Sequence, residues 1–214
     1  MNIIITGTTG MVGEGVLLEC LENPTITNVL MINRKPNYVK HAKLKELLVP
    51  DFFKLDVAEQ LKGYDACFFC AGISSIGMKE EEYTKITYDT TLSFAKKLLE
   101  LNPTMVFDYV SGAATDSSEK GKLMWARVKG KTENDLMKLG FRKQFNFRPG
   151  IMKSVKGQQN MKTSYKILIP ILAPFFGSKV LTLKEVGLAM INSVTKEFPK
   201  QVLEIADIRV LSKK

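Results

Sequence analysis

Three glycines near the N-terminus constrain the fold more than any other feature of the chain. Residues 2–6 read NIIIT, a short β-branched run, and residues 6–13 read TGTTGMVG. The apolar positions that follow lie on one helical face, so the local order is a strand, a tight turn and a helix. A phosphate can approach the backbone amides at a helix N-terminus only where side chains are absent, and the helix dipole favours its negative charge.

This strand, turn and helix predict a dinucleotide-binding loop. The alternative is a glycine-rich turn without a ligand, and the placement of the glycines between a strand and a helix argues against it. The residues expected to contact the dinucleotide here are Gly7, Thr8, Thr9, Gly10, Met11, Val12 and Gly13.

Strand-like and helix-like segments alternate through the first 150 residues, which is typical of an α/β domain with a parallel sheet. Strands are predicted at residues 2–6, 29–32, 46–49, 65–70, 105–110 and 144–147, and helices at residues 79–101, 122–139 and 182–195. We expect a single doubly wound, Rossmann-type α/β domain over residues 1–214, with about six or seven parallel strands. Within it, residues 1–150 would form the cofactor-binding core and residues 151–214 a small substrate-side region.

Composition excludes several other classes of protein. An apolar fraction of 45% is too high for intrinsic disorder, and three cysteines are too few for a disulfide scaffold. The longest apolar stretch, residues 167–176, is shorter than a bilayer requires and contains two prolines, so no transmembrane span is expected. The net charge is +9, but the lysines are dispersed, and no nucleic-acid partner is expected. Without a recognisable leader, a reducing cytoplasm is the expected location.

The residues after the second predicted strand indicate which dinucleotide is bound. In folds of this kind a carboxylate about 20 residues beyond the last glycine accepts a hydrogen bond from the ribose 2′-hydroxyl of NAD, whereas arginine accommodates the 2′-phosphate of NADP. The chain has Asn33, Arg34 and Lys35 at this place. With two cations and no acid, NADP is predicted in preference to NAD, unless these residues form only a solvated basic turn.

At this point the sequence resembles the short-chain dehydrogenase/reductase superfamily, and within it the atypical NAD(P)-binding branch of NmrA-like and Tat-interacting-protein-like oxidoreductases. Besides the glycine loop, the resemblance rests on segments after successive strands: Leu55-Asp56-Val57, Cys70-Ala71-Gly72, Val110-Ser111-Gly112 and Phe147-Arg148-Pro149-Gly150. It covers about residues 1–150. The resemblance implies that Asp56 and Val57 line the adenine pocket and that Ala71 and Gly72 pass beside the adenine ribose. It also implies that Ser111 lies near the nicotinamide and that Pro149 and Gly150 contact the cofactor.

The chain departs from this superfamily at its catalytic pair. The superfamily carries Tyr-x-x-x-Lys on the helix after the fifth strand, and this chain has Trp125 and Lys129 there. The lysine can still hold the nicotinamide ribose, but an indole cannot exchange a proton as a phenol does. General acid catalysis typically raises the reaction rate about 10²- to 10⁴-fold. Because Trp125 cannot supply the proton, the proton donor is unassigned. Ser111 and Lys129 are the expected catalytic residues.

Three functions follow from these residues. The first is an NADP-dependent oxidoreductase that acts on a small carbonyl-type molecule. The second is a non-catalytic NADP-binding sensor or regulatory protein, which needs the pocket but not the acid. The third is nucleotide-sugar epimerase-like chemistry.

The remaining candidates have structural explanations. Cys67 and Cys70 lie in a predicted strand, where their side chains point to opposite faces, so core packing is expected. His41 is the only histidine, which excludes a histidine-rich metal site, and no metal is expected. Residues 165–176 are apolar and aromatic, and they suit a lid over the nicotinamide, a homodimer surface or a peripheral membrane contact.

Overall fold

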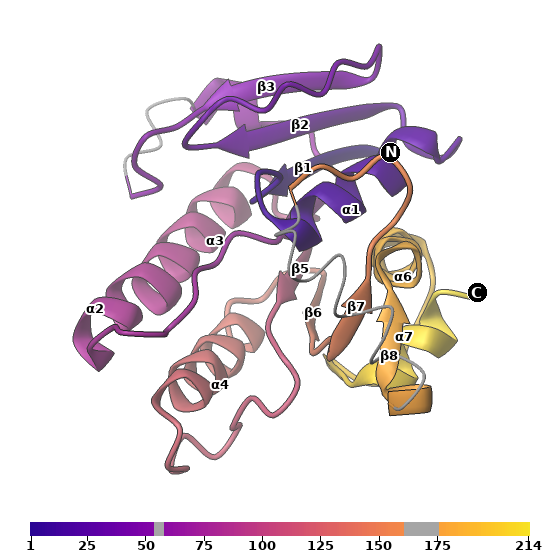
Figure 1. Ribbon diagram of the computed structural model, residues 1–214. Coiled ribbons are helices and arrows are strands. Elements are labelled where there is room, and N and C mark those ends of the chain that lie inside the picture. Colours follow the sequence, from indigo (N-terminus) through magenta and orange to yellow (C-terminus); the bar gives the residue numbers. More distant parts are fainter. Residues whose placement is uncertain (54–57, 161–175) are drawn as a thin grey trace.

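The computed structural model describes residues 1–53, 58–160 and 176–214 and has a seven-stranded sheet at its centre (Figure 1). The strand order is β3-β2-β1-β4-β5-β6-β9, and every neighbouring pair is parallel. This order confirms the predicted doubly wound, Rossmann-type α/β fold. Its strands are β1 (Asn2–Thr6), β2 (Asn28–Asn33), β3 (Leu44–Leu48), β4 (Ala66–Phe69), β5 (Val106–Val110), β6 (Lys143–Phe147) and β9 (Val202–Leu203).

Helices cover both faces of the sheet (Figure 1). The helical segments are α1 (Met11–Glu22), η1 (Ala58–Leu61), α2 (Glu80–Thr84), η2 (Lys85–Asp89), α3 (Thr90–Leu101), α4 (Met124–Met137), η3 (Gly177–Lys179), α6 (Leu183–Thr195) and α7 (Ile205–Leu211). Among the helices that the structure describes, none has the length and apolarity needed to cross a membrane.

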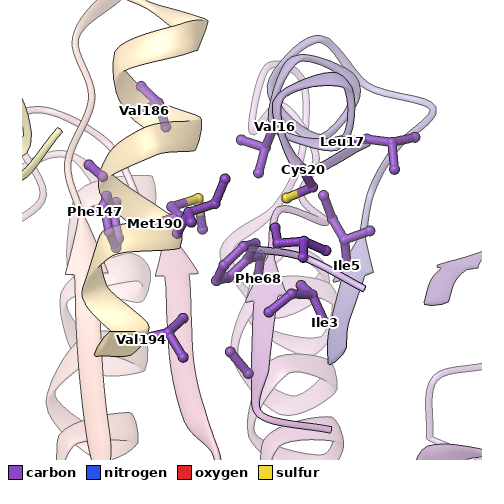
Figure 2. Close-up of a cluster of buried hydrophobic side chains, with 14 of the residues drawn as sticks. Ile3, Ile5, Val16, Leu17, Cys20, Phe68, Phe147, Val186, Met190 and Val194 are labelled. Atoms are coloured by element: carbon purple, nitrogen blue, oxygen red, sulfur yellow. The ribbon is translucent and has the colours of Figure 1, made fainter. Parts of the chain in front are cut away.

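Alternate residues of β1 point into two separate cores, as expected for a strand that is buried on both faces. Ile3 and Ile5 pack in the core beneath α1 and α6, which Figure 2 shows, whereas Ile4 packs in the core beneath α3 and α4. Helices α1 and α6 approach closely because Gly15 and Gly187 lack side chains. A Cβ atom at either glycine would lie 2.8 Å from a side chain of the other helix.

Several boundaries differ from those predicted. The third strand spans Leu44–Leu48 instead of residues 46–49, because Val29 of β2 pairs with Leu44 and fixes the register. The predicted helix at residues 79–101 is three consecutive segments, in which η2 is a single π-helical stretch between α2 and α3. A π-helical turn has i→i+5 hydrogen bonds, and here Thr87 is buried in place of the half-buried Ile86 that the apolar spacing places on the inner face.

The residues beyond 150 contribute to the core as well as to a separate small sheet. Strand β9 extends the main sheet next to β6, and α6 packs against it. Strands β7 (Ile151–Lys153) and β8 (Val180–Thr182) form a parallel pair outside the main sheet. The core therefore extends past residue 150. Most of the apolar stretch at residues 165–176 lies outside the described residues.

Candidate functional site

The glycine loop between β1 and α1 is packed so closely that it has no room for side chains at Gly7 and Gly13. Gly7 has a φ of +71°, and a Cβ atom there would lie 2.6 Å from the backbone nitrogen of Ala71. A Cβ atom at Gly13 would overlap the carbonyl oxygen of Gly7, and Gly10 N donates to that oxygen at 2.9 Å. Side chains at these two positions would push the loop out of place.

The start of α1 leaves backbone donors available. Gly10 is its N-cap and supplies no side-chain capping hydrogen bond, so the first amides of the helix have no side-chain acceptor at this end. An anionic ligand can satisfy such amides. The glycine cradle thus fits the diphosphate of a dinucleotide.

A cavity of about 810 Å³ opens beside this loop, which is large enough for a cofactor. Pro50, Phe52 and Phe53 form part of its apolar wall. It brings together eight residues expected at the cofactor: Gly7, Thr9, Gly10, Asn33, Arg34, Lys35, Ala71 and Gly72. Met11 and Val12 are half-buried in the first turn of α1, and Asp56 and Val57 lie outside the described residues.

A polar network lies beneath the glycine loop. The Thr8 side chain is buried and exchanges hydrogen bonds with Asn33, whose Nδ2 donates to Thr8 Oγ1 at 2.8 Å. Asn37 Nδ2 donates to the Thr8 carbonyl at 3.0 Å, and Glu46 accepts from the Asn37 backbone at 2.7 Å. The Asn33 amide is therefore occupied within the protein, and Arg34 remains exposed at the cavity.

The loop after β5 carries two hydroxyl groups in contact. Ser111 Oγ and Thr115 Oγ1 are 2.9 Å apart, and both residues are buried. The loop is fixed to the end of β6 by the hydrogen bond from Ser111 N to Phe147 O, at 2.8 Å. Ala114 has a φ of 67°, an uncommon conformation for a residue with a side chain. Thr115 is a member of this pair that no motif in the sequence predicts.

The first turns of α4 bring Trp125 and Lys129 to the same loop. The position of a Cβ atom at Gly112, next to Ser111, is 3.8 Å from Cζ3 of the half-buried indole. Lys129 Nζ is 3.5 Å from the Val110 carbonyl oxygen and 5.4 Å from the centre of the Tyr109 ring. Burial lowers the pKa of Lys129 to about 8, although the negative charge of Glu133 opposes this shift.

The tyrosines near this site have structural surroundings. Tyr83 and Tyr109 are buried, and burial raises the pKa of each phenol. Tyr88 Oη donates to Asp135 at 2.8 Å. None of these three phenols therefore has the exposed position of a ready proton donor.

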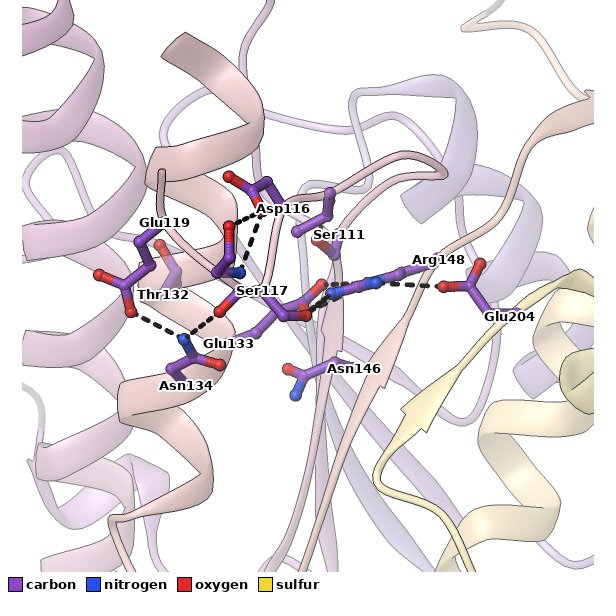
Figure 3. Close-up of polar contacts among 12 residues, drawn as sticks. Ser111, Asp116, Ser117, Glu119, Thr132, Glu133, Asn134, Asn146, Arg148 and Glu204 are labelled. Carbon is purple, nitrogen blue, oxygen red and sulfur yellow. Dashed lines mark hydrogen bonds and ion pairs between the residues drawn. The ribbon is translucent and has the colours of Figure 1, made fainter. Parts of the chain in front are cut away.

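A buried ion pair ties the site to the rest of the fold (Figure 3). Arg148, directly after β6, donates through Nε to Glu133 of α4 at 3.0 Å and through Nη2 to the same carboxylate at 2.5 Å. Arg148 also donates to Glu204 at 3.1 Å and to Ser117 at 2.5 Å. The network joins α4, the end of β6, the loop after β5 and the segment that leads into α7. Pro149 accepts a hydrogen bond from Ala113 at 3.1 Å.

Residues 3–118 match the sequence model of the NAD dependent epimerase/dehydratase family. The chain belongs to this family. The match spans the glycine loop and the loop that carries Ser111, and it is consistent with the resemblance to atypical short-chain dehydrogenases. Its fold is accordingly like that of NAD-binding epimerases.

Relatives of the chain with curated names include fungal proteins. It is 25% identical to "Protein fmp52, mitochondrial" of Emericella nidulans, over 94% of this chain and 90% of the relative. It is 27% identical to "Protein FMP52, mitochondrial" of Candida albicans, over 71% of this chain and 67% of the relative. Because these relatives are named as mitochondrial proteins, the expectation of a cytoplasmic location is overturned.

Solved structures share the fold at low sequence identity. UDP-glucuronic acid 4-epimerase from Bacillus cereus, in complex with NAD, is 14% identical with a TM-score of 0.69, and the match covers 96% of this chain and 76% of the epimerase chain. A thiolation-reductase di-domain from an archaeal non-ribosomal peptide synthetase is 12% identical with a TM-score of 0.71, over 95% of this chain and 70% of that one. Both epimerases and reductases therefore use this architecture.

Proposed function

We propose that this protein is an NADP-dependent oxidoreductase with an atypical active site, acting on a small carbonyl-type molecule. The observation that carries this proposal is the cavity that joins the glycine loop to Arg34 and Lys35. Both cations are exposed at its wall. A guanidinium can bind a 2′-phosphate through paired hydrogen bonds, so the arrangement favours NADP over NAD.

The other residues would divide the cofactor and substrate between them. The amides at the start of α1 would bind the diphosphate, and Lys129 would bind the nicotinamide ribose. Ser111 would orient the substrate oxygen. The bound dinucleotide would supply the hydride, and residues beyond 150 would complete the substrate side.

One observation favours a second candidate, a non-catalytic NADP-binding sensor. By the sequence resemblance Trp125 stands where the superfamily has its proton donor, and its ring lies against the loop that carries Ser111. A sensor needs the pocket but no acid. Turnover of a carbonyl substrate distinguishes the two functions.

The cofactor can be tested with the chain's single tryptophan. NADPH bound with its nicotinamide near Ser111 should quench the fluorescence of Trp125. Energy transfer from Trp125 should at the same time increase the fluorescence of the nicotinamide. We expect tighter binding of NADPH than of NADH, and at least a tenfold loss of NADPH affinity in Arg34→Glu. The matched control is Lys96→Glu, which makes the same charge change on the exposed face of α3.

The possible results separate the parts of the proposal. If neither dinucleotide binds, the cofactor assignment is wrong. If Arg34→Glu weakens NADPH and NADH equally, the preference for NADP is wrong. Tight NADPH binding without turnover across aldehydes, ketones and quinones would favour the sensor.

A further inference from the structure

The substitution of tryptophan at the acid position changes which hydride acceptors the site can reduce. We propose that the site takes a quinone, held against the indole of Trp125 with one oxygen at the Ser111–Thr115 hydroxyl pair. This inference rests on the proposed oxidoreductase function and names its substrate class.

The indole lies against the loop that carries the hydroxyl pair. Trp125 is the second residue of α4, and its six-membered ring reaches to the backbone of Gly112, next to Ser111. The ring is half-buried, so part of it remains accessible. Leu123, the N-cap of α4, is 57% exposed and adds apolar surface at the start of the same helix. A flat aromatic molecule can stack on such a surface, because aromatic rings favour offset-stacked packing.

The hydroxyl pair can supply one hydrogen bond to a ligand. Each hydroxyl carries one hydrogen. Ser111 Oγ and Thr115 Oγ1 lie 2.9 Å apart, which uses one of the two hydrogens between them. The other is available to an acceptor oxygen. The left-handed backbone at Ala114 holds the two residues in this geometry, and strain of this kind is concentrated at functional sites.

The chemistry of the acceptor follows from the missing phenol. Reduction of a saturated ketone places a full charge on an alkoxide, which needs an acid at once. A quinone delocalises the charge of its reduced form over a ring, and a phenolic oxygen has a pKa of only about 10. This anion can therefore form without a protein acid, and solvent can protonate it afterwards.

The electrons and protons of this reaction balance. The quinone would take a hydride from bound NADPH, which would be oxidised to NADP⁺. The quinone receives two electrons and one proton with that hydride, and the hydroquinone monoanion takes a second proton from water. The Lys129 ammonium lies 3.5 Å from the carbonyl oxygen of Val110, the residue before Ser111, and adds positive charge at this end of the site.

The first experiment compares two bicyclic probes, menadione and 1-tetralone, with the full chain and saturating NADPH in the absence of oxygen. Only menadione is a quinone, and we expect its kcat/KM to exceed that of 1-tetralone by at least 100-fold. Trp125→Leu should raise the KM for menadione about tenfold with little change in the Kd for NADPH. Phe198→Leu removes a half-buried aromatic ring that contacts Lys214, and it should change neither constant.

A binding measurement with menadione tests the inference without turnover. A second variant, Trp125→Tyr, tests it in case Trp125→Leu fails to fold. Menadione should bind the free protein in calorimetry, and Trp125→Leu should weaken it. Trp125→Tyr restores a phenol and should raise the rate with 1-tetralone relative to menadione. The inference is overturned if a protein that binds NADPH fails to bind menadione, or reduces 1-tetralone as efficiently. Menadione binding without NADPH binding would instead refute the oxidoreductase function, and with it the role of the quinone as hydride acceptor.

Discussion

Replacing Lys129 with methionine should make the ligand-free protein more stable at neutral pH. Burial lowers the pKa of this lysine from 10.5 to about 8, so the folded state keeps its charge at a cost. A difference of about 2.5 in pKa corresponds to about 3 kcal/mol, at about 1.4 kcal/mol for each pH unit. Because Lys129 is only partly buried, solvent screening reduces this figure, and we expect a gain of about 1 to 2 kcal/mol in the free energy of unfolding.

The dependence on pH gives the prediction its sign. Between about pH 8 and 10.5 the unfolded chain holds a proton on Lys129 that the folded protein has lost, so wild-type stability rises with pH across this window. Lys129→Met removes this rise. Its advantage should be full below pH 8, shrink above it and vanish near pH 10.5.

Urea unfolding followed by circular dichroism, repeated from pH 6.5 to 10.5, measures this difference. Lys131→Met is the matched control on the same helix, since a hydrogen bond to Asp135 raises the pKa of Lys131 and its loss should not stabilise the protein. An equal or lower stability of Lys129→Met at pH 7 would refute the reasoning. So would a gain that persists unchanged to pH 10.5.

Two further substitutions test contacts that hold the site in place. Glu133→Gln removes the charge that pairs with buried Arg148, and it should lower the free energy of unfolding by about 3 to 5 kcal/mol in thermal or urea unfolding; a loss below about 1 kcal/mol would contradict a structural role for the pair. In Glu14→Gln a neutral amide replaces the carboxylate that accepts hydrogen bonds from the backbone amides of Gln159 and Asn160. These two amides should therefore exchange hydrogen faster. Unchanged exchange at both would mean that another contact holds the segment.

The doubly wound fold and the glycine loop could be predicted because their determinants are local. The β-branched run at residues 2–6 and the glycines after it specify a strand and a tight turn within a few residues of each other. Alternation of strands and helices then leaves few topologies, since parallel connections have a fixed hand. The identity of Arg34 and Lys35 beside the cavity followed from their distance along the chain from the loop.

The contacts that complete the site could not be predicted in the same way. Thr8 pairs with Asn33 and Asn37, which are 25 and 29 residues away, and no periodic pattern specifies such a contact. Thr115 meets Ser111 only because Ala114 adopts a left-handed backbone that alanine rarely adopts. The Arg148–Glu133 pair depends on how β6 and α4 pack, which only the tertiary structure defines.

The segment at residues 158–160 is hydrogen-bonded to the first turn of α1. Gln158 donates to the carbonyl of Met11, while the Glu14 carboxylate accepts from Gln159 N at 2.8 Å and Asn160 N at 2.6 Å. Glu14 is buried in the first turn of α1, where an acid lies favourably in the helix dipole but near the proposed diphosphate. The two backbone amides offset part of its charge. Residues 158–160 therefore contact the same helical turn that an anion at the glycine loop would contact.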